Sequence, residues 1–231
     1  MQVKDLSFSN PQDNIAFDDV LFQLADKNGD IQYLRFWESP NYFIVLGRIG
    51  KEEEDINGPQ ADADGISILR RSSGGGTVIQ GPGCLNYTCV LSKLKYPVLN
   101  DLRASYEWIS HKVIEALNIQ GVEAVFKPIS DIALSQGELK FSGNAQRRGK
   151  THILHHGTIL YDFDLSLISK YLLMPKDMPH YRKRRTHNDF VTNVYIDRDT
   201  FKEGLTRAFG LHYLPQPITT QERLSLENYF K

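Results

Sequence analysis

The chain has 231 residues, of which 41% are hydrophobic and 24% are charged, as in an ordinary soluble globular protein. Its net charge of −1 gives no electrostatic basis for binding nucleic acid or an anionic membrane. The N-terminus lacks the apolar core of a secretion signal, and no run approaches the ~20 apolar residues of a membrane span. We therefore expect a cytoplasmic protein with neither nucleic acid nor a membrane as its partner.

Helix and strand signals alternate along the first third of the chain. Residues 10–28 predict a helix, because an Asn-Pro start is followed by apolar positions at helical spacing and an Asn-Gly end. The apolar stretches 31–37 and 42–46 predict two strands. The acidic stretch 51–64 is predicted to be a solvated helix turn and loop, and the apolar run 66–69 a strand.

The same alternation continues to the C-terminus. The clearest helix begins at Asn100 or Asp101, carries apolar residues three or four positions apart and ends at Gly121. Further strands are predicted at 85–91, 122–126, 131–134, 139–142 and 153–161. Further helices are predicted at 164–172, at 201–209 and at 219–229, where Thr219 and Glu222 offer a capping box.

Two basic stretches lie outside these elements. Residues 147–150 are predicted to be an exposed loop. Residues 176–188 carry the run Arg182 to Arg185 and little apolar content, which is typical of a segment that is mobile until something binds. The run is interpreted either as a solvated loop or as a surface that meets an acidic partner.

A glycine-rich stretch between two apolar runs carries the clearest chemical signal. Arg70 and Arg71 precede two serines and the three glycines Gly74 to Gly76. Glycines leave the backbone free to turn its N–H groups toward an anion, and arginines add fork-shaped donors. The stretch is therefore either a flexible turn or a site for a phosphate, an adenylate or a carboxylate. Its spacing fits neither a Walker loop nor a dinucleotide-binding loop.

Two sequence blocks resemble the lipoate-protein ligase and octanoyltransferase superfamily, which also contains the biotin ligases. The first is RRSSGGGTV followed by GPGCLNY, at residues 70–87. The second is SDIALSQGELKFSGNAQRRGKTHILHHGTIL, at residues 130–160. Weaker similarity extends to WESPNYFIVLGRIG and HNDFVTNV, so the resemblance covers most of the chain.

This resemblance implies an α+β fold, with a mixed, mostly antiparallel β-sheet flanked by helices. It implies attachment of lipoic or octanoic acid to a lysine of a lipoyl-domain protein or a glycine-cleavage H protein, through an acyl-adenylate made from ATP with magnesium. Free-standing bacterial ligases of the family carry an additional C-terminal domain. We expect residues 1–231 to be a single catalytic domain without it. The alternatives are then that the protein needs a separate small accessory partner, that it accepts a preformed acyl-adenylate, or that it is a transferase.

The resemblance also assigns residues. Lys140 is the implied catalytic residue, in contact with the acyl carbonyl and phosphate, and Asp131 is implied to hold ribose, adenine or that lysine. The residues implied to line the acyl and adenylate pocket are Arg71, Ser72, Ser73, Gly74, Gly75, Gly76, Asn86, Asp131, Ser142, Gly143, Asn144, His155, His156, Gly157 and Thr158. Adjacent strand residues face opposite ways, so at most one of the two histidines should reach the pocket.

Several features bear on the route of acyl transfer. Gln80 stands where many relatives have a histidine, which removes a titratable group. The transferase branch uses a cysteine nucleophile, and Cys84 is the one cysteine near a motif. An inert buried thiol is the favoured interpretation of it, because no fixed base partner is evident. Cys84 and Cys89 would be roughly 16 Å apart on one strand at ~3.3 Å per residue, too far for a disulfide. No metal site is expected, because the histidines lack zinc-ligand spacing.

Three functions therefore remain open at this point: an adenylate-forming ligase, an octanoyl or lipoyl transferase that uses a carrier thioester, and a non-catalytic module that binds an adenylate or a lipoyl domain.

Overall fold

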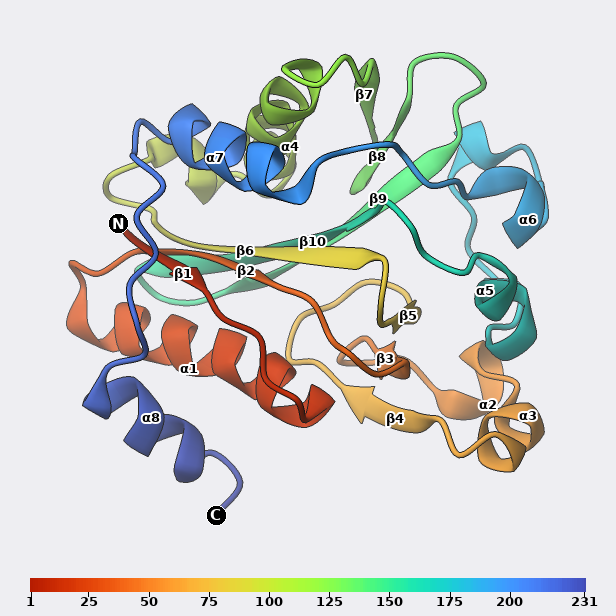
Figure 1. The fold of residues 1–231 in the computed structure, drawn as a ribbon, viewed down its shortest axis with the longest axis horizontal. Coiled ribbons are helices and arrows are strands. Elements are labelled where there is room, and N and C mark those ends of the chain that lie inside the picture. Colours follow the sequence, from red (N-terminus) through yellow and green to blue (C-terminus); the bar gives the residue numbers. More distant parts are fainter.

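A seven-stranded sheet forms the centre of the fold, and a three-stranded sheet lies beside it (Figure 1). The computed structural model describes residues 1–231, except for the side chain of Asn28. The large sheet contains β1 (Gln2–Asp5), β2 (Tyr33–Trp37), β6 (Cys84–Ser92), β7 (Ala124–Lys127), β8 (Asp131–Leu134), β9 (Lys140–Arg148) and β10 (His152–Leu160). The small sheet contains β3 (Phe43–Leu46), β4 (Ser67–Arg70) and β5 (Val78–Gln80).

Strand pairing in the large sheet is mixed and mostly antiparallel. The strand order is β1-β2-β6-β10-β9-β8-β7, and only β1 pairs with its neighbour in parallel. In the small sheet, β3 pairs in parallel with β4 and antiparallel with β5. The predicted fold class is confirmed, but the strands predicted at 31–37 and 42–46 belong to different sheets.

Helices cover both faces of the large sheet. The longer ones are α1 (Pro11–Asn28), α4 (Leu102–Asn118), α7 (Arg198–Ala208) and α8 (Thr220–Glu227). The shorter ones are α2 (Glu52–Asp55), α3 (Gly58–Ala63), α5 (Ser166–Tyr171) and α6 (His187–Phe190), with the 3₁₀ turns η1 (Pro97–Asn100) and η2 (His180–Arg182). Among the described residues, no helix combines the length and the apolar content needed to cross a membrane.

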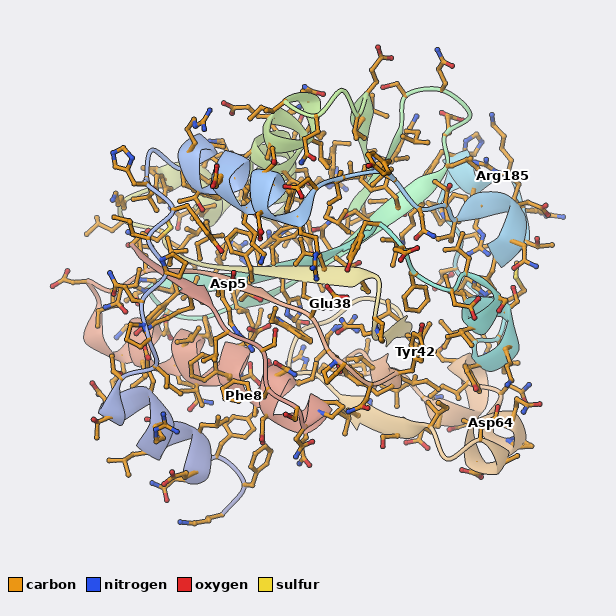
Figure 2. All side chains as sticks on the ribbon, viewed as in Figure 1. Asp5, Phe8, Glu38, Tyr42, Asp64 and Arg185 are labelled. Atoms are coloured by element: carbon orange, nitrogen blue, oxygen red, sulfur yellow. The ribbon has the colours of Figure 1, made fainter. Side chains whose placement is uncertain are left out.

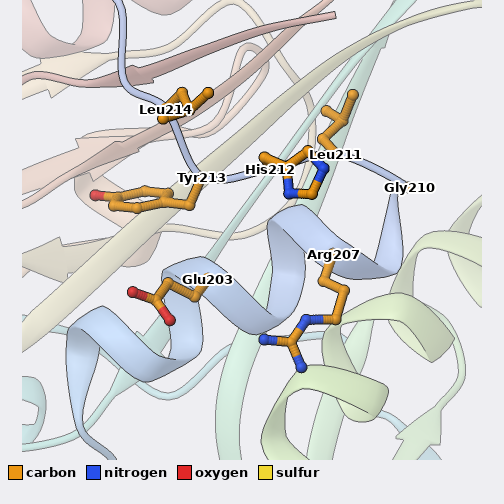
Figure 3. A pocket seen from close by; sticks show the side chains of 7 residues that line it. All are labelled: Glu203, Arg207, Gly210, Leu211, His212, Tyr213 and Leu214. Carbon is orange, nitrogen blue, oxygen red and sulfur yellow. The ribbon is translucent and has the colours of Figure 1, made fainter.

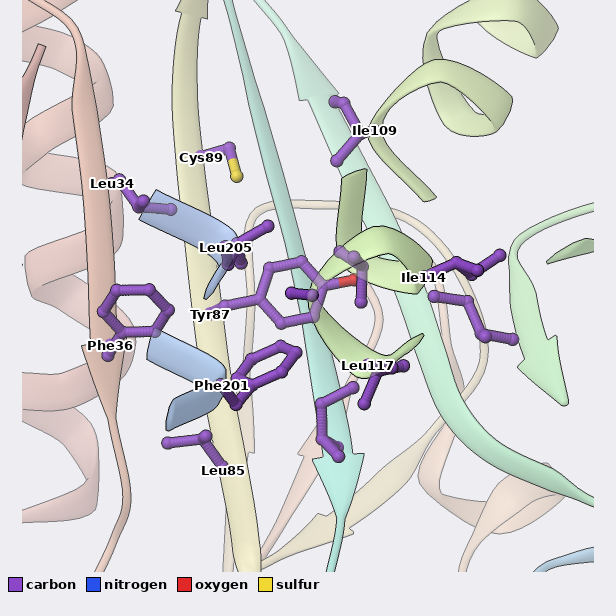
Figure 4. Packing of buried hydrophobic residues seen from close by; sticks show 14 of the residues in the cluster. Leu34, Phe36, Leu85, Tyr87, Cys89, Ile109, Ile114, Leu117, Phe201 and Leu205 are labelled. Carbon is purple, nitrogen blue, oxygen red and sulfur yellow. The ribbon is translucent and has the colours of Figure 1, made fainter. Parts of the chain in front are cut away.

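The two faces of the large sheet have different neighbours. On one face, which we term the α4 face, Tyr87 and Phe141 pack with apolar residues of α4 and α7, as Figure 4 shows for part of this core. On the other, which we term the α1 face, Val90 and Leu154 pack against α1. Burial of these apolar side chains is the main stabilising contribution to the fold.

The predicted starts of three helices are confirmed. Asn10 caps α1, Asp101 caps α4, and Thr219 forms a capping box with Glu222 at the start of α8. Each cap satisfies backbone N–H groups that the first helical turn leaves without partners. The acidic stretch 51–64, predicted as one helix turn and a loop, forms two short helices, α2 and α3.

The exposed loop predicted at residues 147–150 is wrong for its two arginines. Arg147 and Arg148 belong to β9, which continues to its turn with β10. Arg148 donates hydrogen bonds to the carbonyls of Leu99 and Asn100 and to Gln146 Oε1. The sequence did not predict so long a hairpin, because the residues near its turn are polar and resemble a loop. In the structure the side chains of Arg147 and Arg148 form hydrogen bonds with α1 and η1.

A buried ion pair joins the two ends of the chain. Lys4 Nζ on β1 lies 2.9 Å from Glu222 Oε2 on α8, and the two side chains are 0% and 2% exposed. Removing one partner of such a pair leaves an uncompensated charge away from water. The pair therefore holds α8 and β1 together, with Glu222 also capping α8.

We predict that Lys4→Met lowers the free energy of unfolding by about 3 kcal/mol, because it leaves the Glu222 carboxylate buried without its cation. Urea denaturation measures this. The control Lys51→Met disrupts an ion pair whose lysine side chain is 59% exposed, and should change stability far less, because solvent screens the pair. Equal losses in both variants, or a double variant Lys4→Met/Glu222→Gln no more stable than Lys4→Met, would contradict the prediction.

Candidate functional site

The glycine-rich stretch forms the loop between β4 and β5, and Arg71 holds it in shape. The guanidinium of Arg71 donates to the carbonyls of Gly74 and Gly76 at 2.6 and 2.7 Å, and to Ser73 Oγ at 3.0 Å. Gly75 has a φ of +84°, which a side chain would strain. A Cβ on Gly47 would lie 2.1 Å from the Gly75 carbonyl oxygen, so the loop packs directly on backbone.

Arg71 is a buried clamp rather than a free cation. It is 8% exposed, and burial lowers its pKa to about 10, which still leaves it charged at neutral pH. Its donors are engaged by carbonyls of its own loop and of β3. The charge is therefore fixed in place before any ligand arrives, but few N–H donors of Arg71 remain to bind a ligand directly.

The loop rests on the α1 face of the large sheet through two serines. Ser73 Oγ lies 2.6 Å from His156 Nε2 on β10. Ser72 Oγ donates a hydrogen bond to Asp19 on α1. A small hollow lies here, lined by Ile15, Asp18, Asp19, Arg71, Ser72, Leu154 and His156. The structure thus brings the predicted loop residues and His156 together, with two acidic residues that sequence reasoning missed.

Asp18 anchors this side of the hollow. Burial raises the pKa of its carboxyl group. Arg35 at 2.6 Å, together with His156 and Thr88, lowers the pKa by more than burial raises it, so the net pKa lies below its ordinary value. The carboxylate is therefore charged at neutral pH, and its Oδ2 lies 3.6 Å from His156 Nδ1. The signal that could have revealed it is a pair of adjacent aspartates within the apolar pattern of the first helix.

Lys140 lies at the start of β9 on the same α1 face. Its Nζ is 2.7 Å from Asp131 Oδ1 on β8, and its side chain is 29% exposed against 9% for Asp131. The other oxygen of Asp131 accepts a hydrogen bond of 2.7 Å from Tyr181 Oη. Gly143 gives the lysine room, because a Cβ there would meet Nζ at 3.2 Å. Asp131 was expected to hold ribose, adenine or Lys140, and in the structure it pairs with Lys140.

Other predicted residues share this face with the loop. Ala145 and His156 pair across β9 and β10, and a Cβ on Gly75 would lie 3.6 Å from that of Ala145. Asn86 on β6 and Thr158 on β10 are also paired in register. Because alternate strand residues share a face, Asn86, His156 and Thr158 point to the same side as Lys140.

Three predicted pocket residues lie on the opposite, α4 face. Ser142, Asn144 and His155 point there, with Asn144 Oδ1 3.2 Å from His155 Nε2 and bonded to the Tyr87 hydroxyl. Their side chains therefore lie on the other side of the sheet from the glycine loop, and their part in the pocket stays a prediction. The expectation that the two adjacent histidines face opposite ways is confirmed, and the one beside the glycine loop is His156.

The α4-face residues support the site from behind. Asn144 donates through its side chain and its backbone to the carbonyl of Ser130, at 2.8 and 3.0 Å, which fixes the residue before Asp131. A Cβ on Gly157 would lie 1.9 Å from Asn144 Oδ1, so only glycine lets this amide pack on β10. These residues of the motif therefore position β8, β9 and β10 against one another.

His155 is neutral in this buried network. Its Nδ1 faces the Gln146 amide nitrogen at 3.0 Å and its Nε2 faces the Asn144 carbonyl oxygen at 3.2 Å, which fits one proton, on Nε2. Burial, with a smaller effect of His156, lowers its pKa from 6.5 to about 3. The residue has no part in proton transfer near neutral pH.

Cys84 lies on the α1 face but is closed to solvent. It is 1% exposed, and burial raises the pKa of its thiol well above the ordinary range. A reactive cysteine needs the opposite, a lowered pKa and access. Gln80, 7% exposed, keeps its side-chain carbonyl oxygen without a hydrogen-bond partner among the described residues.

The basic run folds onto the hairpin that carries Lys140. Arg182 is 4% exposed. Arg185, which is labelled in Figure 2 near the edge of the molecule, donates hydrogen bonds to the carbonyls of Gly137 and Glu138 at 3.0 and 3.1 Å. The solvated-loop interpretation is therefore wrong for these two arginines. Lys183, which pairs with Glu138 at 3.1 Å, has a side chain that is 69% exposed.

A larger open groove lies elsewhere, at the end of α7. It has a volume of about 560 Å³ and is lined by Glu203, Arg207, Gly210, Leu211, His212, Tyr213 and Leu214 (Figure 3). None of these residues belongs to a predicted motif. The candidate site is therefore the α1 face beneath the glycine loop, despite its smaller opening. Within the described residues, no group of three or more His, Cys, Asp or Glu side chains gathers as a metal site.

We predict that His155 makes stability sensitive to acid. Because its folded pKa of about 3 lies below the ordinary 6.5, its contribution is present above pH 6.5 and is lost as the pH falls toward 3. At pH 5 the loss should be about 2 kcal/mol, at ~1.36 kcal/mol per pH unit. In urea denaturation, His155→Gln should lose less stability between pH 7.5 and 5 than the wild type. The exposed His111→Gln should not differ from it. Parallel profiles for all three proteins would contradict this assignment.

Comparison with known proteins identifies the family of the chain. A family described as "Lipoyl protein ligase A/B catalytic domain" matches residues 10–210. A probable lipoate-protein ligase A of Mycoplasma pneumoniae is 32% identical over 206 residues, which cover 86% of this chain and 58% of that protein. Lipoate-protein ligase A of Blochmanniella floridana is 31% identical over 228 residues, which cover 95% and 64%. The chain thus spans about three fifths of the length of these relatives.

Solved structures give the same picture. A lipoate-protein ligase A bound with ATP superimposes with a TM-score of 0.80 at 26% identity, covering 99% of this chain and 93% of the other. A bipartite lipoate protein ligase of Thermoplasma acidophilum, studied with its E2 lipoyl domain, has a TM-score of 0.85 at 23% identity, with 99% and 91% covered, and shows the shared fold. On its sequence, fold and motif geometry, this chain belongs to the lipoyl protein ligase A/B catalytic domain family.

Proposed function

We propose that this chain is the catalytic domain of a ligase that joins lipoate or octanoate to a lysine of a lipoyl-domain protein through an acyl-adenylate. The observation that carries the proposal is the pairing of Lys140 with Asp131 on the sheet face that also holds the clamped glycine loop and His156. Membership of the family and the lipoate-protein ligases among its relatives support it. Residues 1–231 are proposed to form one such domain.

The first step joins the acid to AMP. A carboxylate oxygen of the acid attacks the α-phosphorus of ATP, the bond to the bridging oxygen breaks, and pyrophosphate leaves with the electron pair. The loop from Ser72 to Gly76 supplies backbone N–H donors for the phosphate, and the charge of Arg71 behind it is already fixed. Such preorganised donors stabilise charge that develops during the reaction.

The second step transfers the acyl group to the acceptor. The neutral amine of the acceptor lysine attacks the acyl carbonyl, the bond to the AMP oxygen breaks, and AMP leaves while the amine loses a proton to solvent. Lys140 Nζ offsets the negative charge on the carbonyl oxygen and the leaving phosphate. Asp131 holds the ammonium group before the substrate arrives, at a distance of 2.7 Å.

Magnesium is not proposed as a resident of the protein. Among the described residues no set of acidic side chains fits a dedicated cage, and a magnesium ion that enters with ATP is commonly held by phosphates and water. No step here is assigned to it.

The acceptor is proposed to be a lipoyl domain, because a relative of the same fold was studied with its E2 lipoyl domain. A glycine-cleavage H protein is a second acceptor of the same chemistry, and a separate small domain that assists adenylation is a proposed partner.

The transferase alternative is less well supported. It needs a reactive cysteine, and Cys84 is buried with a thiol pKa raised by that burial. A non-catalytic binding module would not need Lys140 to be held by a carboxylate on the same face as the loop.

We predict that Lys140→Ala lowers formation of the acylated lipoyl domain by at least about 100-fold, because the cation that offsets developing charge is lost. Mass spectrometry of the lipoyl domain after incubation with lipoate and ATP measures this. The exposed Lys150→Ala is the control and should retain wild-type turnover. Full activity of a folded Lys140→Ala protein would exclude the proposed role, and no acylation by the wild type, with or without an accessory domain, would exclude the ligase.

We predict that Cys84→Ser retains acyl transfer within about threefold, because a buried thiol with a raised pKa supplies little thiolate. The same assay is run with lipoate and ATP, and then with an octanoyl carrier protein as donor. Loss of transfer from the carrier protein in Cys84→Ser, with the fold intact, would instead favour the transferase.

A further inference from the structure

The C-terminal segment reaches the candidate site through one side chain. Tyr229 follows α8, which packs along α1 (Figure 1). Its hydroxyl group donates a hydrogen bond of 2.7 Å to Asp19 Oδ2. Tyr229 is thus 210 residues away from Asp19 in sequence but in direct contact with an aspartate that lines the hollow beneath the glycine loop.

Asp19 connects this tyrosine to two residues of the site. Its Oδ1 accepts hydrogen bonds from Ser72 Oγ and, at 3.1 Å, from Arg147 Nη1. The Asp19 side chain is 4% exposed, so its three donors replace the water that it has lost. The Arg147 guanidinium lies over the ring of Phe22, 4.9 Å from its centroid, and is 35% exposed.

This arrangement leaves most of Arg147 free for a ligand. Within the described residues, its recorded polar contact is the single bond from Nη1 to Asp19. A guanidinium has five N–H donors in a fork that matches a carboxylate or phosphate. The donors that remain are therefore available, on the face where Lys140 and His156 also lie.

The tyrosine determines which geometry Asp19 adopts. With Oδ2 engaged by Tyr229, the carboxylate meets Arg147 through one oxygen only. Without that hydroxyl group, both oxygens become available to the guanidinium, and the two-bond pairing that arginine prefers with a carboxylate is open to it. Arg147 would then be held by Asp19 more tightly and would offer fewer donors to a ligand.

Helix α8, which precedes Tyr229, is itself well anchored. Glu222 on α8 pairs with Lys4 at 2.9 Å, and Ile218 and Leu226 pack against the apolar cluster on α1. The position of the hydroxyl group is therefore set by the fold rather than by the tyrosine alone.

We propose that Tyr229 is a positioning residue of the acyl-adenylate site: by holding Asp19, it keeps the unengaged N–H donors of Arg147 available to the anionic part of the substrate, a carboxylate or an α-phosphate. The inference rests on the proposed function for the identity of that ligand. It assigns to the C-terminal helix a part in the site that neither sequence motif contains.

The test compares Tyr229→Phe with Tyr195→Phe in the full chain, with lipoate, ATP and a lipoyl domain as substrates. The first variant removes one hydroxyl group and keeps the ring, and the second does the same at a ring that is 96% exposed. We expect Tyr229→Phe to raise the KM for lipoate or ATP about fivefold with kcat changed less than twofold, since binding donors rather than the reacting lysine are affected. Tyr195→Phe should match the wild type. Equal KM values in both variants would overturn the inference and leave the ligase standing.

A double-mutant cycle distinguishes positioning from a structural effect. In an Asp19→Asn background, Tyr229→Phe should change KM no further, because the carboxylate through which Tyr229 acts on Arg147 is already absent. Additive effects of the two substitutions would overturn the inference.

A readout without substrate separates this inference from the proposed function. The NMR signal of the Arg147 Nε–H group, assigned by its loss in Arg147→Lys, should shift in Tyr229→Phe and stay in place in Tyr195→Phe. An unmoved signal would overturn the inference even if the wild type is an active ligase. A shifted signal in a protein without ligase activity would uphold the contact and reject the proposed function.

Discussion

The two-residue period of β9 and β10 is the constraint on which the site depends. These strands pair antiparallel at the centre of the large sheet, so each successive side chain goes to the α1 face or to the α4 face. One motif therefore does two things. His156 meets the glycine loop, while His155, its neighbour, joins a neutral buried network that fixes the strands. A slip of one residue would exchange the two roles.

Charge on the α1 face is organised in ion pairs. Asp18 lies at 2.6 Å from Arg35, Asp131 at 2.7 Å from Lys140, and Asp19 at 3.1 Å from Arg147. Burying a charge costs less when a partner and hydrogen bonds replace water. The cations are thus held in place before a ligand binds, which is the preorganisation that adenylate chemistry needs, and the acidic partners come from α1 and β8 rather than from the glycine loop.

Much of the local structure could be predicted from sequence, and the site only in part. Asn10, Asp101 and Thr219 are local signals, because a cap needs only its own helix. The motifs indicated Lys140, Asp131 and the glycine loop through a family resemblance. They also suggested Ser142, Asn144 and His155 as pocket residues, because a motif names positions without saying which face each occupies. Asp19 was missed as a partner of the loop and of Arg147, since its contacts with Ser72 and Arg147 span 53 and 128 residues.

By itself, the sequence determined where α1, α4 and α8 begin, where most of the strands lie, and which residue types gather around a glycine loop suited to an anion. Those features depend on spacing and backbone preference within a few residues. Only the tertiary structure decided that β10 lies between β6 and β9 and that the guanidinium of Arg71 hydrogen-bonds to its own loop. It also decided that Cys84 is buried and that the Tyr229 hydroxyl contacts Asp19. These are long-range contacts, and they follow from how the sheets and helices pack, which no local pattern encodes.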